Sequence, residues 1–203
     1  MTPISTHYFS LSKRTFDFSL AIFLAIFLSP LLLLIAITIL ISSGMPIIFT
    51  QKRTGKDGKT FTIYKFRTMK KNASLLKHKY LEFNEAPSPM FKIHNDPRFV
   101  GIGKLLSQSG FDELPQLVNI IKGEMSFVGP RPLPVQEAAS LNQNWKSFRE
   151  QVKPGVFSEW TLSSNRHSTL KKWQELEEKT LSYSNLKNDL EVMIKVMLKQ
   201  HNP

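Results

Sequence analysis

The chain of 203 residues contains no cysteine, which excludes disulfide bonds and thiolate metal sites and fits a protein that faces the cytosol. It also has no glycine-rich phosphate loop and no Ser-His-Asp pattern, and its five histidines lack metal-ligand spacing. Acidic residues are few: the chain has 16 Asp and Glu residues and 27 Lys and Arg residues, which gives a formal net charge of +11. This excess indicates an anionic partner, such as nucleic acid, anionic lipid or a phosphorylated substrate.

The positive charge is concentrated between Lys52 and Lys79, where ten Lys or Arg residues stand against a single acid, Asp57. Such a run is often only a solvated face. Here it directly follows an apolar segment, and that position favours anionic headgroups or substrate phosphates. Nucleic acid is the weaker alternative, because the sequence contains no recognition motif and no aromatic platform for RNA bases.

The apolar segment, residues 18–41, contains no charged residue. As a straight helix it would be roughly 36 Å long, enough to cross a hydrocarbon core of about 30 Å. Three interpretations are open: a cleaved signal peptide, a straight span, and a bent, re-entrant hairpin. The segment is long for a signal peptide, and residues 42–44 make a poor cleavage site.

The middle and the flanks of this segment favour the hairpin. Ser29 and Pro30 lie at its midpoint, where proline kinks a helix and the serine hydroxyl can bond a freed backbone group. Basic residues lie before the segment as well as after it, and a hairpin keeps both flanks in the cytosol. We therefore expect residues 1–45 to form a membrane-embedded re-entrant helix, and residues 46–203 to form a cytosolic catalytic domain.

The rest of the sequence predicts a mainly α fold with a short β-hairpin and amphipathic interfacial helices. A turn signal at 55–59 separates the two β-rich segments of the hairpin, residues 46–49 and 61–64. Helical patterns cover residues 70–85, 98–107 and 168–200. A further helix is expected to open at Asp112 and to end at Lys122-Gly123.

Adjacent carboxylates, Asp112 and Glu113, stand at the start of that last helix. Acids are common at such positions, because they cap the helix and interact favourably with its dipole. Adjacent carboxylates also suit a divalent metal, or a nucleophile paired with a base. The residues alone leave both interpretations open.

Two further patterns bring cations into rigid or regular settings. In residues 129–132, Arg131 stands between two prolines, which preorganises it for bidentate phosphate contacts unless the loop is merely stiff. In residues 64–67 cations alternate with aromatics along an expected strand, so Lys65 and Arg67 share one face. A solvated strand face is the alternative for this second pattern.

Taken in order, these segments resemble the small monotopic phosphoglycosyl transferases of the bacterial sugar transferase family. The resemblance covers roughly residues 10 to 155, and its two most specific segments are those that begin at Asp112 and Lys122. The matching segments are Lys13-Arg14-x-x-Asp17, the apolar run with Ser29-Pro30, Gln51-x-Arg53-x-Gly55, Tyr64-Lys65-Phe66-Arg67-Thr68-Met69, Asn95-Asp96-Pro97-Arg98, Asp112-Glu113-Leu114-Pro115-Gln116, Lys122 through Pro132, and Lys153-Pro154-Gly155.

The resemblance implies that a sugar 1-phosphate passes from a UDP-sugar to polyprenyl (undecaprenyl) phosphate with Mg²⁺, giving polyprenyl diphosphate sugar and UMP. It implies that Asp112 is the nucleophile and a metal ligand, that it forms a covalent phosphosugar intermediate, and that Glu113 is the general base. Lys65 and Arg131 are the expected chief phosphate contacts. The further expected substrate-binding residues are Arg67, Arg98, Pro132 and Gln116, and Lys13 and Arg14 are expected at the lipid headgroup level.

The expected location is the bacterial inner (cytoplasmic) membrane, with the catalytic domain in the cytosol. The reaction would be the first membrane step of a glycoconjugate pathway. Its expected partners are the UDP-sugar donor, the polyprenyl phosphate acceptor and membrane lipids, with no nucleic acid and with a possible homodimer.

Two departures from the family pattern bear on function. Many members carry Arg five residues before the nucleophile, where this chain has Ser107, and Lys104 lies one helical turn from it. The family's usual C-terminal pattern is also largely absent from residues 156–203, so the donor sugar is not inherited from better-known members. A membrane-bound scaffold that binds substrate without turnover is the alternative function.

Overall fold

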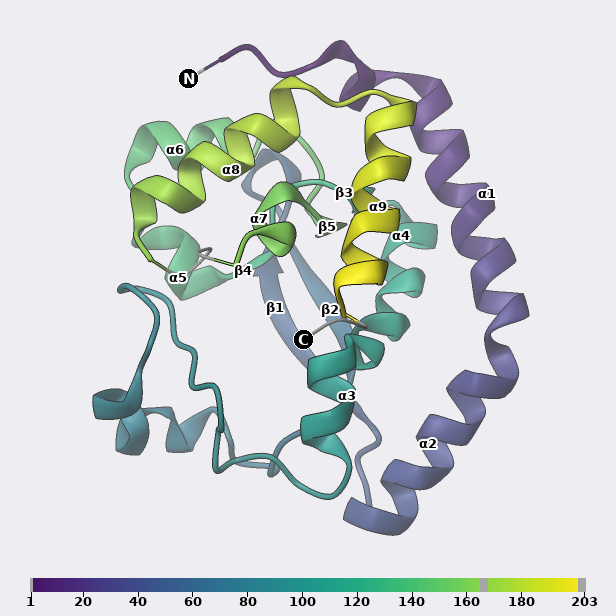
Figure 1. The fold of residues 1–203 in the computed structure, drawn as a ribbon, viewed down its shortest axis with the longest axis vertical. Helices are drawn as coiled ribbons and strands as arrows, with labels where there is room; N and C mark the ends of the chain where they lie inside the picture. Colours follow the sequence, from purple (N-terminus) through teal and green to yellow (C-terminus); the bar gives the residue numbers. More distant parts are fainter. Residues whose placement is uncertain (1, 165–167, 201–203) are drawn as a thin grey trace.

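The apolar segment folds as two helices that run along one side of the protein (Figure 1). This computed structural model describes residues 2–164 and 168–200, so residues 165–167 and 201–203 of the expected catalytic domain lie outside the described residues. The described fold is mainly helical with small sheets, as the sequence predicts.

Its helices are η1 (Thr6–Phe9), α1 (Leu11–Phe27), α2 (Ser29–Ser43), η2 (Lys56–Gly58), η3 (Leu75–Phe83), α3 (Gly103–Ser109), η4 (Phe111–Gln116), α4 (Leu117–Lys122), α5 (Val135–Ala139), α6 (Gln143–Arg149), α7 (Glu159–Leu162), α8 (Leu170–Ser182) and α9 (Leu186–Gln200). Its strands are β1 (Ile48–Thr54), β2 (Thr60–Phe66), β3 (Ser126–Val128), β4 (Leu133–Pro134) and β5 (Gly155–Phe157).

The break between α1 and α2 falls at Leu28, and the two helices are bent by 61°. Pro30 stands in the first turn of α2, and the Ser29 hydroxyl donates to the Ile26 carbonyl at 2.8 Å. The predicted kink, and the predicted role of the serine at it, are therefore confirmed. Among the described residues, no single helix is long and apolar enough to cross a membrane, whereas this bent pair passes by length and composition.

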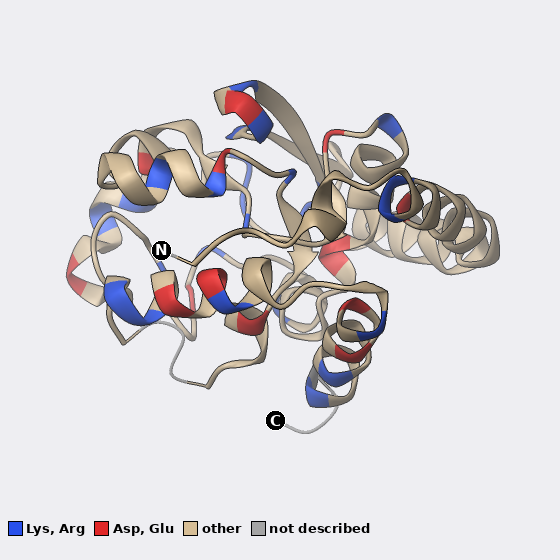
Figure 2. Ribbon diagram, turned by 90° about the horizontal axis from the view of Figure 1, so that it is seen from above, with Lys and Arg blue, Asp and Glu red and all other residues tan. Residues whose placement is uncertain are grey.

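One face of the helix pair packs on the rest of the protein. Ala21 of α1 is fully buried in a core with Ile120 and Phe127, and Ile39 of α2 packs near Phe66. The two expected domains therefore share hydrophobic cores. The opposite face is apolar and exposed, and beyond its first turns the pair carries no charge (Figure 2). Its exposed side chains include Phe23, Ile26, Phe27, Leu33, Leu34, Ile37 and Ile41.

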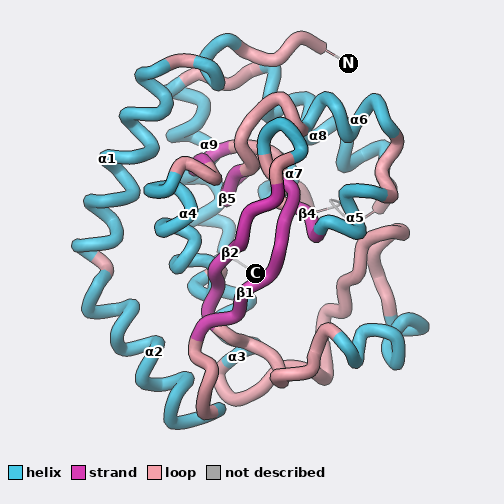
Figure 3. The backbone as a smooth tube through the Cα atoms, turned by 180° about the vertical axis from the view of Figure 1, so that it is seen from behind, coloured by secondary structure: helices cyan, strands magenta, loops and turns pink. Residues whose placement is uncertain are grey.

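The predicted β-hairpin is confirmed, with strands longer than the sequence patterns suggest. β1 and β2 pair antiparallel with Gln51 opposite Ile63, and β4 pairs with β1 on its other edge (Figure 3). The turn contains Asp57 and Gly58, whose φ angles of 56° and 69° explain the Asp-Gly signal. Ile63 is almost fully buried, so the hairpin also contributes to the core.

A second, two-stranded sheet holds the loop that carries Arg131. β3 and β5 pair parallel, and the Gly155 amide donates to the Pro130 carbonyl at 2.9 Å. A Cβ atom on Gly155 would lie 2.1 Å from the Gly129 nitrogen, so only glycine allows this approach. The Lys153-Pro154-Gly155 segment thus fixes the start of the Gly-Pro-Arg-Pro loop.

The C-terminal pattern expected as one helix over residues 168–200 forms two helices, α8 and α9. Thr169 caps the first, because its hydroxyl accepts from the Lys172 amide. Asn185 begins the second, because its side chain accepts from the Asn188 amide at 3.0 Å. An asparagine that caps a new helix therefore divides the pattern.

Candidate active site

Asp112 and Glu113 lie in η4, the short helix that continues directly into α4. Gly110, with a φ angle of 74°, ends α3 and turns the chain into η4. This helix packs against β2, so the two carboxylates face the strand that carries Lys65. Asp112 is only 8% exposed. The predicted helix start and its end at Gly123 are confirmed, although the first turn is a 3₁₀ helix.

Two cations from different elements converge on Glu113. The Lys65 ammonium donates to Oε1 of Glu113 at 2.5 Å, and Nη1 of Arg131 lies 3.9 Å from the same oxygen. The side chain of Lys65 is 15% exposed and that of Arg131 is 36% exposed, so the cluster reaches solvent on the Arg131 side. In contrast, the Asp112 carboxylate forms no ion pair within the part of the chain that the structure describes, and it accepts a hydrogen bond from its own backbone amide.

The two carboxylates have opposite pKa shifts. Burial raises the pKa of Asp112 to about 6, to which the charge of Glu113 adds, while Lys65 and Arg131 oppose the rise. Burial alone would also raise the pKa of Glu113, but the charges of Lys65 and Arg131 outweigh it and hold that pKa at about 2. The free site therefore holds one basic, unpaired carboxylate beside one firmly ionised, paired carboxylate.

The loop that carries Arg131 is held by two other arginines. Arg53 of β1 donates to the Pro132 carbonyl at 2.9 Å, and Arg149 of α6 donates to the Arg131 carbonyl at 2.5 Å. Burial and the charge of Arg131 lower the pKa of Arg53 to about 10. Neither supporting arginine was among the expected site residues, although the Gln51-x-Arg53-x-Gly55 segment carries the signal for the first.

Gln116 lies one helical turn after Asp112 and is 2% exposed. Its Nε2 is buried and has no hydrogen-bond partner in the described part of the chain. A buried amide without a partner is costly, and such a group is often completed by a ligand or water. The expected substrate-binding role of Gln116 stays a prediction, and the unpaired donor supports it.

Arg67 and Arg98, both expected to bind substrate, are buried and form structural contacts. Arg67 donates to the carbonyls of Ser43, Gly44 and Met45, which end α2. Arg98 forms a bidentate pair with Asp96 and donates to the Ala73 carbonyl. Nε of Arg67 is buried and has no hydrogen-bond partner among the described residues, and the substrate-binding role expected for both arginines stays a prediction.

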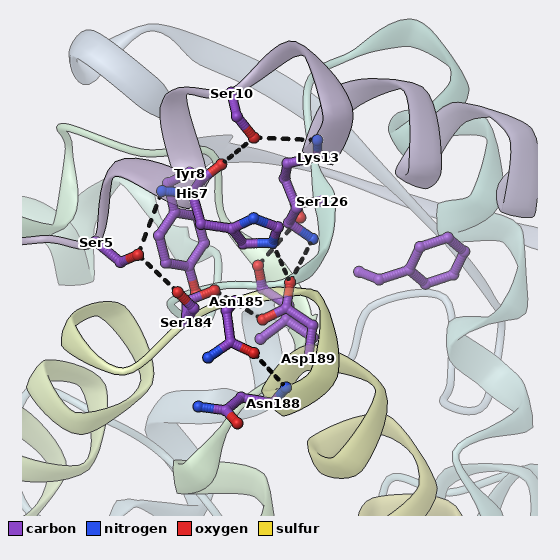
Figure 4. Close-up of polar contacts among 12 residues, drawn as sticks. Ser5, His7, Tyr8, Ser10, Lys13, Ser126, Ser184, Asn185, Asn188 and Asp189 are labelled. Carbon is purple, nitrogen blue, oxygen red and sulfur yellow. Dashed lines mark hydrogen bonds and ion pairs between the residues drawn. The ribbon is translucent and has the colours of Figure 1, made fainter.

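Lys13, expected at the lipid headgroup level, has a side chain that is only 4% exposed, and the expected headgroup role stays a prediction. It lies between Asp17 and Asp189 at 2.8 and 3.0 Å, and Figure 4 shows it pointing with His7 toward Asp189 of α9. Arg14 is half-buried and donates to the Ile120 and Ile121 carbonyls at the end of α4. The basic pair thus joins α1 to the globular part.

The position where family members often carry Arg is exposed in this protein. Ser107 lies on α3, and Lys104 on the same helix is also exposed. Lys104 forms no ion pair within residues 2–164 and 168–200. Its substitution for the missing arginine therefore stays a prediction.

The carboxylates fit a magnesium ion that is completed by substrate. Within the described residues, no group of three His, Asp or Glu side chains could hold a metal ion. Mg²⁺ is commonly held by one or two carboxylates together with substrate phosphates and water. The Asp112 carboxylate, which forms no ion pair with a described residue, offers oxygen donors of the kind that this arrangement requires.

Comparisons with known proteins point to one family. The sequence model of the bacterial sugar transferase family matches residues 8–202. The exopolysaccharide production protein ExoY of Sinorhizobium fredii is 39% identical over 157 residues, which are 75% of this chain and 69% of that protein.

Two longer relatives have names that state an activity. The UDP-glucose:undecaprenyl-phosphate glucose-1-phosphate transferase of Escherichia coli is 35% identical over 85% of this chain. The undecaprenyl-phosphate galactose phosphotransferase of Salmonella typhimurium is 35% identical over 74% of this chain. The aligned parts are only 36% and 32% of these two proteins.

Proposed function

The chain belongs to the bacterial sugar transferase family, and on that premise we propose that it transfers a sugar 1-phosphate from a UDP-sugar to polyprenyl phosphate. The names of the Escherichia coli and Salmonella typhimurium relatives support an undecaprenyl phosphate acceptor, and the former supports a UDP-sugar donor. The observation that carries the proposal is the contrast between the two neighbouring carboxylates of η4. Asp112 forms no ion pair to any residue that the structure describes and has a raised pKa, whereas two cations hold Glu113 ionised.

The reaction proceeds in two displacements at the sugar-bearing phosphorus of the donor. An Asp112 carboxylate oxygen forms a bond to this phosphorus, the bond to the bridging oxygen breaks, and UMP leaves with the electron pair. An oxygen of polyprenyl phosphate then attacks the same phosphorus and releases Asp112. Lys65 and Arg131 offset the repulsion between the attacking carboxylate and the diphosphate.

Glu113 takes the proton, if one is present, from the incoming polyprenyl phosphate. With a pKa of about 2 in the free site it is a weak base, because Lys65 and Arg131 stabilise its charge. The phosphoryl groups of the donor, and after UMP leaves the phosphoryl group on Asp112, compete for the same two cations. Their binding therefore raises the basicity of Glu113 when the acceptor needs it.

A bound Mg²⁺ would neutralise part of the diphosphate charge, with Asp112 as its protein ligand. The residues of the chain perform the other tasks. Arg131 and Lys65 orient the phosphates, and the prolines that flank Arg131 restrict its backbone. Gln116 offers an amide hydrogen to the substrate.

We propose further that α1 and α2 enter the bacterial cytoplasmic membrane and return. Their exposed face is apolar over both helices, and the 61° bend supports re-entry. In this arrangement the carboxylates lie near the headgroups. The acceptor can then present its phosphate to the site while its polyprenyl tail remains in lipid.

Release of UMP in the absence of acceptor tests this function. Purified protein in detergent with Mg²⁺ and a panel of UDP-sugars is expected to release UMP in an amount comparable to enzyme, and only with the correct donor. EDTA is expected to stop the release. UMP that forms only after polyprenyl phosphate is added would instead indicate direct displacement.

A further inference from the structure

The guanidinium of Arg131 lies between the active site and a cluster of tryptophans. Its Cζ is 5.1 Å from the ring centroid of Trp160, while its Nη1 faces Glu113. Trp160 stacks on Trp173 at 5.1 Å, and Trp173 meets Trp145 edge-on at 5.6 Å. The chain contains three tryptophans, so all of them belong to this cluster.

A single buried carboxylate organises the cluster. Glu177 of α8 is 0% exposed and accepts hydrogen bonds from the indole nitrogens of Trp145 and Trp173, at 3.0 and 2.9 Å. It also pairs with Arg149, whose Nε and Nη2 lie 2.7 and 3.0 Å from its two oxygens. The same Nη2 donates to the carbonyl of Arg131.

Glu177 therefore reaches Arg131 by two routes. Through Arg149 it fixes the backbone of Arg131, and through the stacked indoles of Trp173 and Trp160 it fixes the surface on which the guanidinium rests. We propose that Glu177, Arg149 and Trp160 form a positioning unit that aims Arg131 at the diphosphate of the donor. This inference rests on the proposed function, because it assigns a role within the same site.

The location of the unit explains how the C-terminal region takes part in the reaction. Trp160 and Glu177 belong to α7 and α8, in the part of the chain that departs from the usual family pattern. A buried ion pair is weak support for stability, because desolvation offsets much of the attraction. A cation over an aromatic face is attracted to it and restricted in orientation. These properties suit a unit that positions Arg131.

Kinetics of Trp160 variants test the proposal. Trp160→Leu removes the aromatic face, and we expect it to raise the KM for the donor by about 2- to 30-fold, as loss of a cation–π contact predicts. The KM for polyprenyl phosphate should not change. Trp160→Phe keeps a ring under Arg131 and should restore most of the loss. Phe148→Leu is the matched control, because Phe148 is a buried aromatic on α6 that belongs to a different cluster.

A double variant shows whether Trp160 acts through Arg131. In an Arg131→Gln background, which removes the cation from the ring, Trp160→Leu should change the donor KM much less than in the wild type. Equal effects in both backgrounds would overturn the proposal. So would a Trp160→Leu protein with wild-type donor kinetics, or one in which the donor and acceptor constants change together.

Intrinsic fluorescence provides a test that needs neither turnover nor a variant of the cluster. Because every tryptophan lies in the cluster, binding of UDP with Mg²⁺ to Arg131 should change the emission of the wild-type protein. Equilibrium dialysis with radiolabelled UDP measures binding independently. Binding without a change in emission would overturn the proposed unit, whereas failure of the proposed function would appear as no UMP release from any UDP-sugar.

Discussion

At the scale of single residues, the two carboxylates of η4 differ in how their charge affects the stability of the folded protein. Asp112→Asn should abolish transfer, because an amide does not attack phosphorus and is a poor ligand for Mg²⁺. The same change should stabilise the fold by about 1–3 kcal/mol at pH 7, since it removes a buried charge whose pKa burial raises to about 6. Activity by UMP release and thermal unfolding in detergent measure the two effects.

The sign of this stability effect depends on pH. The folded pKa of Asp112 lies above its ordinary value of 3.8, so the native state loses stability as pH rises from about 4 to about 6. The advantage of Asp112→Asn should therefore vanish below about pH 4 and be complete above about pH 6. A variant that is less stable than wild type at pH 7 would contradict the burial argument.

The same ionisation controls the first displacement. Asp112 attacks only as a carboxylate, so the rate of UMP release at donor concentrations well below saturation, which reports the ionisation of the free enzyme, should fall as pH drops through about 6. Glu113, with a pKa near 2 in the free enzyme, contributes no step in that range. Stopped-flow or quenched-flow measurement of the UMP burst between pH 5 and 8 is the test. A rate that stays constant through pH 6 would show that Asp112 titrates elsewhere.

Residue types in the sequence predicted the acidic pair, its helix and Lys65, but could not separate binding cations from structural ones. Arg67, Arg98 and Lys13 occur in segments that match the family, and so does Arg131. Their partners come from distant elements or from a local turn that folding brings into the interior. Burial and hydrogen-bond partners depend on this packing, so a local cation pattern does not reveal them.

At the scale of elements, Arg67 connects the end of α2 to the hairpin. Arg67→Ala would leave the carbonyls of Ser43, Gly44 and Met45 without this donor, and we expect a loss of about 2–4 kcal/mol of stability. The KM for the donor should not change in the protein that remains folded. Thermal unfolding together with donor kinetics checks both statements.

Lys65→Met is the matched comparison for Arg67→Ala, because Lys65 is the neighbouring cation of the same segment. Its ammonium contacts Glu113 in the site, so transfer should fall by about 100-fold or more, and stability should also fall because Glu113 loses the cation that most favours its charged form. A rise in the donor KM of Arg67→Ala as large as that of Lys65→Met would support the substrate-binding role expected for Arg67.

Element boundaries followed the local signals where these signals determine the structure. Ser29-Pro30, the Asp-Gly turn and Gly123 each ended or bent an element as predicted. The helix expected over 98–107 instead begins at Gly103, where a Cβ atom would lie 1.9 Å from the Thr68 carbonyl oxygen. That close approach depends on a distant strand end, and the local helical pattern does not contain it.

At the scale of the whole molecule, the N-terminal segment is tied to the globular part. The Ser5 amide donates to the Leu181 carbonyl at 2.9 Å, and His7 and Lys13 both contact Asp189 of α9. Arg67 holds the end of α2, so both ends of the bent helix pair are attached to the same body. A straight span that carried the N-terminus across a membrane would break these contacts and leave the Asp189 carboxylate without its cation.

We therefore predict that the segments before α1 and after α2 face the same side of the membrane. The chain has no cysteine, so single-cysteine variants report one position each. Thr6 and Thr60 are both exposed, so they suit labelling, whereas the Ser5 hydroxyl is bonded to the Ser184 carbonyl.

Thr6→Cys and Thr60→Cys should both resist a membrane-impermeant maleimide in whole cells, with any outer membrane permeabilised, and react after lysis. Labelling of Thr6→Cys alone in intact cells would show a straight span, and labelling of both would place the catalytic part outside. The re-entrant arrangement requires that neither variant is labelled in intact cells. In that arrangement the apolar outer face of the bent pair lies in lipid while the contacts of Asp189 with His7 and Lys13 stay intact.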